Sequence, residues 1–357
     1  MKEKASPYSN LKVFAHADKL EAIKREERTA PVYVRIKPTN ACNHRCYYCS
    51  YADNELGLRD EVKVKDRIPW PKMKEIINDL GEMGVKAVTF SGGGEPLVYP
   101  EIAEAMQAVL NNGIDLSIIT NGHKLKGQIA EILCAAKWVR ISLDAADAQT
   151  YAKIRGIALS SFQEVCDNIK HFAQIKSAGC ELGVNFVINH ENALQVFDIA
   201  RLVRDLGVNH IKYTARITRD LDNYHRPFKQ EAIEQLHKAQ ADLNRPGFNI
   251  INKYEDDFEF STVFKRSYKY CWIKEFFAVV AADCRVYFCH DKAYVSNGVV
   301  GDLRQTSFKE LWFSPEVIQR YRDFDAGQEC CHHCVFDDRN ILLNTFFSLD
   351  ENHINFI

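Results

Sequence analysis

The amino-acid sequence predicts an α/β fold: a partial (β/α)6 barrel of the TIM type, followed by a smaller C-terminal α+β domain. Short apolar runs alternate with helical patterns through the first two thirds of the 357 residues. Six such units, each with a helix after its strand, indicate a parallel sheet with right-handed crossovers. After about Tyr224 the pattern changes, and cysteines recur from Cys271 onward. These observations divide the chain into an N-terminal helical arm (1–30), a barrel (31–245) and a C-terminal domain (246–357).

The predicted strands are short and nearly continuous in apolar residues, as expected of strands buried on both faces. We expect strands at Val32–Lys37, Ala87–Ser91, Leu116–Thr120, Val139–Asp144, Leu182–Asn189 and Ile211–Ala215. Helical periodicity predicts helices at Met73–Met83, Ile102–Asn111, Phe162–Ser177, Ala193–Leu206 and Lys229–Leu243. Pro100 before the second of these helices and Gly113 after it are usual helix punctuation. The charged stretch Lys19–Arg28 predicts a packing helix, and a hairpin is expected around Asp283–Tyr287.

The composition excludes several classes of protein. The net charge is −2, and no basic stripe of the kind that binds nucleic acid is visible. No apolar run approaches the ~20 residues that a membrane span needs. The first residues lack a hydrophobic signal core, which predicts a cytoplasmic protein. Twelve cysteines in such a chain read better as metal ligands and buried thiols than as a disulfide framework.

Three cysteines with the spacing Cys-x3-Cys-x2-Cys follow the first predicted strand: Cys42, Cys46 and Cys49. Three thiolates leave the fourth position of a bound metal centre open, whereas a structural zinc site closes itself with four ligands. Thiolates select zinc or iron–sulfur clusters, and a 4Fe-4S cluster held by three cysteines keeps one iron free for a ligand. The alternative is a zinc knuckle in which His44 or a distant residue supplies the fourth ligand.

Polar and glycine-rich sequences also end the next strands. They are Ser91-Gly-Gly-Gly-Glu-Pro96, Thr120-Asn-Gly122, Ser142-Leu-Asp144 and Asn189. Active sites of barrels gather at the carboxyl ends of their strands. We therefore expect these residues and the cysteine loop to meet at one mouth.

The cysteine loop, its place after the first strand and the Gly-Gly-Glu-Pro sequence after the second resemble the radical S-adenosylmethionine (radical SAM) superfamily, over about Val32 to Arg216. The resemblance implies a 4Fe-4S cluster that binds S-adenosylmethionine (SAM). It also implies reductive cleavage of SAM to methionine and a 5′-deoxyadenosyl radical that takes a hydrogen atom from the substrate. An external one-electron donor, such as a flavodoxin or a ferredoxin, is implied as well.

The same resemblance assigns roles to residues at the mouth. Gly92, Gly93, Gly94 and Glu95 match the stretch that contacts the amino group of SAM. Ser142 and Asp144 lie where ribose contacts are found, Arg155 matches an arginine that pairs with the methionine carboxylate, and Tyr48 matches an aromatic beside the adenine. Asn189 is a further cofactor-binding candidate. Alternatively, Ser142 and Asp144 cap the following helix, and Arg155 forms a surface ion pair.

The C-terminal cysteines carry a second resemblance. Cys271-x17-Cys289 and Cys331-x2-Cys334 resemble twitch, the shortened relative of the SPASM auxiliary-cluster domain. This implies one auxiliary 4Fe-4S cluster with four protein ligands, because no cysteine follows Cys334. Cys330 could replace Cys331, since spacing does not decide between them. The alternative is a zinc site of four cysteines, or of cysteines with His332 and His333.

Cys284 stands where such modules usually carry a glycine. It is either a buried thiol or a hydrogen-atom donor to a substrate radical, as in radical SAM epimerases. Cys134, Cys166 and Cys180 are expected to be core thiols.

The single-cluster module resembles enzymes that oxidise an alcohol of aminocyclitols and sugars. We therefore expect a radical SAM oxidoreductase acting on a small polar substrate, such as a sugar, a cyclitol or a nucleotide-linked sugar. Two alternatives are an epimerase of a sugar or peptide that uses Cys284, and a peptide-modifying maturase. A non-catalytic zinc-binding module on a barrel scaffold is a third.

Overall fold

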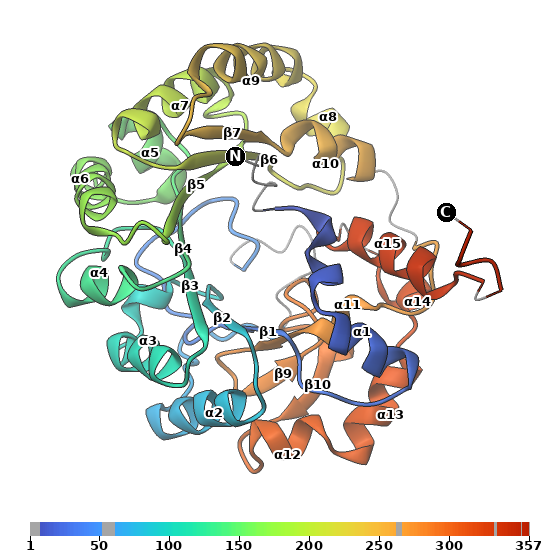
Figure 1. The fold of residues 1–357 in the computed structure, drawn as a ribbon. Helices are drawn as coiled ribbons and strands as arrows, with labels where there is room; N and C mark the ends of the chain where they lie inside the picture. Colours follow the sequence, from blue (N-terminus) through green and yellow to red (C-terminus); the bar gives the residue numbers. More distant parts are fainter. Residues whose placement is uncertain (1–7, 52–60, 262–265, 332–333, 351, 357) are drawn as a thin grey trace.

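The computed structural model describes residues 8–51, 61–261, 266–331, 334–350 and 352–356. Its strands form one ten-stranded sheet in the order β10-β9-β8-β1-β2-β3-β4-β5-β6-β7. The pairs from β8 to β7 are parallel, and only β9 and β10 run antiparallel to their neighbours. Figure 1 shows the sheet curving into an arc, with helices on its outer side. The predicted α/β partial barrel is thereby confirmed.

All six strands expected from the sequence are present as β1 to β6, and four further strands follow them in the described residues. The strands are β1 (Tyr33–Ile36), β2 (Ala87–Phe90), β3 (Asp115–Thr120), β4 (Trp138–Ser142), β5 (Glu181–Ile188), β6 (His210–Ala215), β7 (Asn249–Asn252), β8 (Phe277–Val280), β9 (Arg285–Tyr287) and β10 (Val299–Asp302). The predicted hairpin around Asp283–Tyr287 is formed by β8 and β9.

The helices on the barrel are α2 (Trp70–Glu82), α3 (Ile102–Asn111), α4 (Gln128–Leu133), α5 (Ala148–Arg155), α6 (Ser160–Ile175), α7 (Val196–Asp205), α8 (Leu221–His225), α9 (Lys229–Leu243) and α10 (Tyr254–Ser261). Before the barrel lies α1 (Ala17–Lys24). After it come α11 (Ile273–Phe276), α12 (Phe308–Trp312), α13 (Pro315–Asp323), α14 (Ala326–Glu329) and α15 (Asp337–Phe347).

The apolar pattern of each element decides which face it buries. In α2, Met73, Ile76, Ile77 and Leu80 follow helical spacing and are fully buried against the sheet. In the strands, alternate side chains point to opposite faces. Val34 and Ile36 of β1 therefore pack in the main core under the helices. Their neighbours on β1 face the concave side of the sheet, which we call the inner face.

The two parts of the chain share this sheet. β7 pairs in parallel with β6, so the parallel strands continue after residue 245. β8 pairs with β1, which makes β1 a central strand. The N-terminal arm packs on the C-terminal part, because Val13 and Leu20 share a second core with Ile273 and Leu343.

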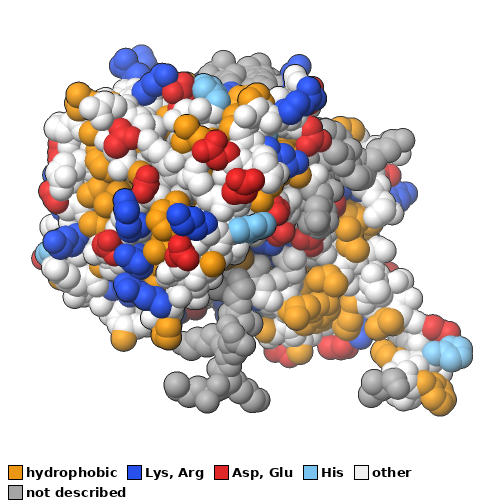
Figure 2. Space-filling model, turned by 90° about the horizontal axis from the view of Figure 1, so that it is seen from above, with side chains coloured by type: hydrophobic (Ala, Val, Ile, Leu, Met, Phe, Trp, Pro, Cys, Tyr) orange, Lys and Arg blue, Asp and Glu red, His pale blue; other side chains and the backbone are white. Residues whose placement is uncertain are grey.

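Two observations concern the surface. In the described part of the chain, no helix combines the length and the apolarity that crossing a membrane requires. On the face seen in Figure 2, basic and acidic side chains are interspersed.

Candidate active site

The cysteine loop leaves β1 and is anchored to the end of α5. The amide of Arg45 donates to the carbonyl oxygen of Arg155 at 2.8 Å, and that of Tyr47 donates to Ile154 at 3.3 Å. Cys42 is exposed, and Cys46 and Cys49 are partly buried. Burial raises the pKa of the Cys42 thiol to about 11, and the charges of Glu95 and the other two cysteines act in the same direction. The three thiols therefore share one electrostatic environment at the mouth.

The glycine loop after β2 lies directly against the cysteine loop. Gly94 donates its amide to Thr39 at 2.9 Å, and Glu95 donates to Ala41 at 2.9 Å. A side chain at Gly94 would overlap the backbone of Ala41, and one at Gly93 would overlap the side-chain amide of Asn40. From the sequence, these glycines were expected to make room for a bound ligand. In the structure, they allow the close contact between the two loops.

Glu95 is buried beneath the same loop. One carboxylate oxygen accepts hydrogen bonds from the amide of Leu97 at 3.0 Å and the hydroxyl of Thr120 at 2.5 Å. The other accepts from the amide of Asn121 at 2.7 Å. Burial raises the pKa of Glu95, while these hydrogen bonds oppose the shift. Glu95 thus ties the loops after β2 and β3 together, and a direct bond from it to a ligand stays a prediction.

Four predicted cofactor-binding residues meet around Arg155. Its guanidinium donates to the Asp144 carboxylate, to the carbonyl oxygen of Ser142 at 2.8 Å and to Cys46 Sγ at 3.4 Å. The Tyr48 hydroxyl donates to the same Asp144 oxygen. Although burial opposes its charge, the neighbouring Asp144 raises the pKa of Arg155. Arg155 is therefore part of the cysteine site and not a surface ion pair.

The helix-capping alternative is not what the structure shows. The side chain that caps α5 is Asp147, which accepts from the amide of Thr150 at 2.9 Å. Asp144 instead accepts from the amide of Val187 on β5 at 2.8 Å. Asn189 is fully buried, and its side-chain oxygen accepts from the hydroxyl of Tyr47 at 3.0 Å. Asn189, which follows β5, thus binds the cysteine loop through Tyr47.

We expect Asp144→Asn to lower the free energy of unfolding by about 3–5 kcal/mol, because it leaves the Arg155 guanidinium buried without a counter-charge. The side chains of the pair are only 7% and 1% exposed. Urea denaturation of the cluster-free protein measures the change. The control is Asp198→Asn, which breaks an exposed ion pair with Arg201 and should cost about 1 kcal/mol or less. Equal losses in the two variants would contradict this account.

A second thiol site lies between the C-terminal elements. A narrow cavity there is lined by Cys271, Cys289, Cys330 and Cys334. Burial raises the pKa of the Cys330 thiol to about 12, and Cys271 adds to the shift. Asn340 donates its side-chain amide to Cys271 Sγ at 3.6 Å.

The structure distinguishes the two adjacent cysteines that spacing left open. Cys330 is buried and lines the cavity, whereas Cys331 is exposed and its Sγ donates to the carbonyl oxygen of Gln328 at 3.5 Å. This arrangement favours Cys330 over Cys331, the residue preferred from the Cys-x2-Cys spacing. His332 and His333, invoked for a mixed zinc site, lie outside the described residues.

Cys284 occupies the turn between β8 and β9 with a φ of 61°, a left-handed conformation that favours glycine. It is buried in the main core. Burial raises the pKa of its thiol to about 11, and Asp283 and Asp302 add to this effect. These surroundings favour the buried-thiol interpretation over the hydrogen-donor interpretation.

Lys37 is a functional candidate that the sequence analysis missed. It follows β1, is 1% exposed, and donates to the carbonyl oxygen of Gly92 at 2.8 Å and to the hydroxyl of Tyr51. Burial, and then the charge of Arg35, lower the pKa of Lys37 to about 7. The sequence offered one sign of this role, because a charged lysine ends an otherwise apolar strand. In the structure, the buried amine of Lys37 lies between the cysteine loop and the glycine loop.

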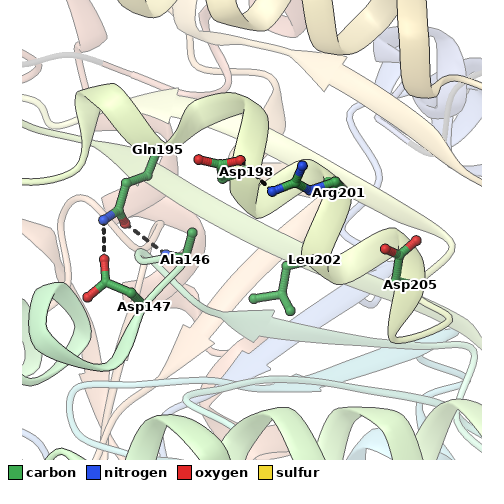
Figure 3. A pocket seen from close by; sticks show the side chains of 7 residues that line it. All are labelled: Ala146, Asp147, Gln195, Asp198, Arg201, Leu202 and Asp205. Atoms are coloured by element: carbon green, nitrogen blue, oxygen red, sulfur yellow. Dashed lines mark hydrogen bonds and ion pairs between the residues drawn. The ribbon is translucent and has the colours of Figure 1, made fainter.

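A further groove lies elsewhere, on the outer side of the barrel. It is lined by Ala146, Asp147, Gln195, Asp198, Arg201, Leu202 and Asp205 (Figure 3). The Gln195 side chain accepts from the amide of Ala146 at 2.8 Å and donates to Asp147, and Asp198 pairs with Arg201. These polar groups bond to one another along the groove, which lies between the residues that precede α5 and the side of α7.

The donor sets suit iron–sulfur clusters. Thiolates hold the irons of a 4Fe-4S cluster, three of them where one iron stays open and four where the cluster is closed, and hydrogen bonds to the sulfurs tune its reduction potential. Arg155 points at Cys46 Sγ, and the amide of His44 donates to Cys42 Sγ at 3.4 Å. Burial lowers the pKa of His44 to about 3, and its ring packs near His123 and Tyr151. In the described ranges, no three His, Cys, Asp or Glu side chains gather around a single-ion position.

Comparison with protein families assigns both parts of the chain. Residues 36–203 match the radical SAM superfamily. Residues 271–335 match SPASM, an iron–sulfur cluster-binding domain. The two matches contain the three-cysteine loop and the four-cysteine cavity, respectively. The expectations of SAM, of a 4Fe-4S cluster and of auxiliary iron–sulfur binding are confirmed at this level.

The similar proteins include a peptide cyclase, a maturase and a probable GTP 3′,8-cyclase. The PqqA peptide cyclase of Gluconobacter oxydans is 23% identical over 317 residues, which are 87% of this chain and 84% of the cyclase. The mycofactocin maturase MftC of Mycobacterium tuberculosis is 32% identical over 192 residues, 53% of this chain and 45% of the maturase. A probable GTP 3′,8-cyclase of Saccharolobus solfataricus is 29% identical over 50% of this chain and 54% of the cyclase. The chain thus spans about half the length of the last two.

Solved structures share the fold. Streptococcus suis SuiB bound to its precursor peptide SuiA has a TM-score of 0.61 at 15% identity, covering 91% of this chain and 74% of SuiB. The anSMEcpe protein with bound AdoMet has a TM-score of 0.59 at 16% identity, covering 83% of each chain.

Proposed function

From the premise that this chain is a radical SAM enzyme with a SPASM domain, we propose that it modifies a peptide. The observation that carries the proposal is the similarity to the PqqA peptide cyclase, which extends through both domains and covers most of both chains. The similarity to the maturase MftC supports it. The expected oxidation of a sugar or cyclitol has no comparable support, so the peptide-modifying alternative replaces it as the favoured reaction.

The chain supplies two binding sites for the reaction. Cys42, Cys46 and Cys49 would hold the SAM-binding cluster, and Cys271, Cys289, Cys330 and Cys334 would hold one auxiliary cluster. When bound, the first cluster supplies the electron that cleaves SAM and so provides the hydrogen-abstracting species. The glycine loop and Arg155 both contact the cysteine loop, and there they would orient the methionine end of SAM.

Arg155 also holds the cysteine loop in place. It joins Cys46 to Asp144, so the position of the cysteine loop depends on the residues that would meet the nucleoside end of SAM. Because Asp144 also accepts from the backbone of β5, this link is fixed to the sheet. This fixed arrangement of Arg155 and Asp144 would restrict movement of bound SAM relative to the mouth, which positions the reacting groups.

The test is anaerobic incubation of the reconstituted full chain with SAM, dithionite and short peptides encoded beside it in its genome. Mass spectrometry should show a peptide of altered mass, together with 5′-deoxyadenosine. Peptides left unchanged, while a sugar or cyclitol is oxidised under the same conditions, would refute the proposal. Formation of 5′-deoxyadenosine without any added substrate tests the radical SAM chemistry separately.

A further inference from the structure

Positive charge accumulates on the inner face of the sheet. Arg140 of β4 and Lys212 of β6 alternate with residues that are buried under the helices, so both point to the concave side. Only β5 separates them, since Arg140 pairs in register with Gly183 and Lys212 with Asn185. Arg35 of β1 lies on the same face by the same alternation. All three side chains keep part of their surface accessible.

These cations act on one another across the inner face. Burial, and then the charge of Arg140, lower the pKa of Lys212 to about 7, with Lys253 and Arg35 acting in the same direction. The carboxylate of Asp257 of α10 opposes this shift. Burial raises the pKa of Asp257 itself to about 6.

The carboxylate of Asp257 and two aromatic rings compensate these charges only in part. Lys212 lies over the ring of Tyr8 at 5.0 Å, and Arg140 lies near the ring of Trp138 at 5.9 Å. Within the described ranges, neither side chain forms a salt bridge, and Nε of Arg140 is buried without a hydrogen-bond partner.. Withdrawing cations from water without an anion is costly. Arg35 is better balanced, because the charge of Asp291 acts on it.

We propose that Arg140 and Lys212, with Arg35 across the inner face, form an anion-binding site for a carboxylate of the substrate. The carboxylate would be that of an Asp or Glu side chain or of the C-terminus of a peptide. The peptide nature of the substrate rests on the proposed function, whereas the preference for an anion does not. A guanidinium beside an amine suits a carboxylate, which accepts charge-assisted hydrogen bonds from both.

The proposed anion-binding site is next to the mouth along β4. Ser142 is the next residue of β4 on the same face as Arg140, and its carbonyl oxygen accepts from Arg155. A carboxylate held by Arg140 would therefore direct the neighbouring peptide residue towards the cysteine loop. The inner face would in this way select which residue of the substrate is presented for hydrogen abstraction.

The test is calorimetric titration of the full chain, at low salt, with two probes. They are the acidic peptide acetyl-Glu-Glu-Glu-amide and the isosteric neutral peptide acetyl-Gln-Gln-Gln-amide. We expect the acidic probe to bind about tenfold more tightly or better, as one charge-assisted hydrogen bond predicts. Lys212→Met and Arg140→Gln should remove this preference, and Lys212→Arg should retain it. The control is Lys137→Met, because Lys137 is an exposed lysine just before β4.

A pH series gives a second readout that a merely structural role would not produce. The groups that face Lys212 are Arg35, Arg140, Lys253, Asp257 and Tyr8. Because Lys212 loses its proton as the pH rises through about 7, the affinity for the acidic probe should fall there. Ionisation of Asp257 as the pH rises through about 6 acts in the same direction. In Lys212→Arg the fall near 7 should disappear, while the one near 6 should remain.

Three outcomes would overturn the inference: equal affinity for the two probes, variants that thermally unfold like the parent and bind like it, or inorganic phosphate outcompeting the acidic peptide. Failure of the proposed function looks different. In that case the acidic probe binds and 5′-deoxyadenosine forms from SAM, yet no peptide changes in mass.

Discussion

Cys46→Ala is expected to abolish the formation of 5′-deoxyadenosine from SAM. Cys46 is one of the three thiols after β1, and it also accepts the hydrogen bond from Arg155 that ties the loop to Asp144. Its removal takes away both a cluster ligand and this link, and a 4Fe-4S cluster requires its full set of thiolates. Chromatography of the anaerobic reaction mixture measures the product, and iron analysis should show loss of about four iron atoms per chain.

The matched control for this loss is Cys134→Ala. Cys134 follows α4, and its Sγ bonds only to the carbonyl oxygen of Ala130 within the same helical turn. We expect this variant to retain its iron and its activity. If Cys46→Ala still cleaves SAM at the parent rate, the three-cysteine loop does not hold the reactive cluster.

Cys330→Ala is expected to remove the auxiliary cluster, whereas Cys331→Ala leaves it in place. The reason is geometric, since Cys330 lines the cavity with Cys271, Cys289 and Cys334, and Cys331 faces solvent. The measurement uses a background in which Cys42, Cys46 and Cys49 are all alanine, so that only auxiliary iron remains. In this background, Cys330→Ala should lose about four iron atoms and the matching acid-labile sulfide. Loss of iron from Cys331→Ala instead would restore the ligand set expected from the Cys-x2-Cys spacing.

The six barrel strands followed from the sequence because each is a short, nearly continuous apolar run between helical patterns. Two helices, α3 and α9, begin and end where the sequence predicted. The three-cysteine loop was equally accessible, because its ligands are adjacent in the chain. The sequence analysis also placed Tyr48, Ser142, Asp144 and Arg155 at one mouth, and the structure joins them through hydrogen bonds.

Other features depend on contacts between distant residues, which a local pattern does not contain. β7 and β8 are strands of four residues, and their pairing with β6 and β1 is visible only in three dimensions. The choice between Cys330 and Cys331 depends on the direction in which the chain leaves α14. The cations of the inner face are far apart in sequence, and only the curvature of the sheet brings Arg35 within electrostatic reach of Lys212.

The pairing of β8 with β1 has a consequence for attempts to trim this protein. A fragment that stops before Phe277 would strip one side of β1 and leave its backbone N–H and C=O groups without partners. An exposed edge strand of this kind promotes pairing between molecules and aggregation. The same strand, β1, leads into the cysteine loop. The C-terminal third of the chain is therefore needed to complete the sheet that positions this loop.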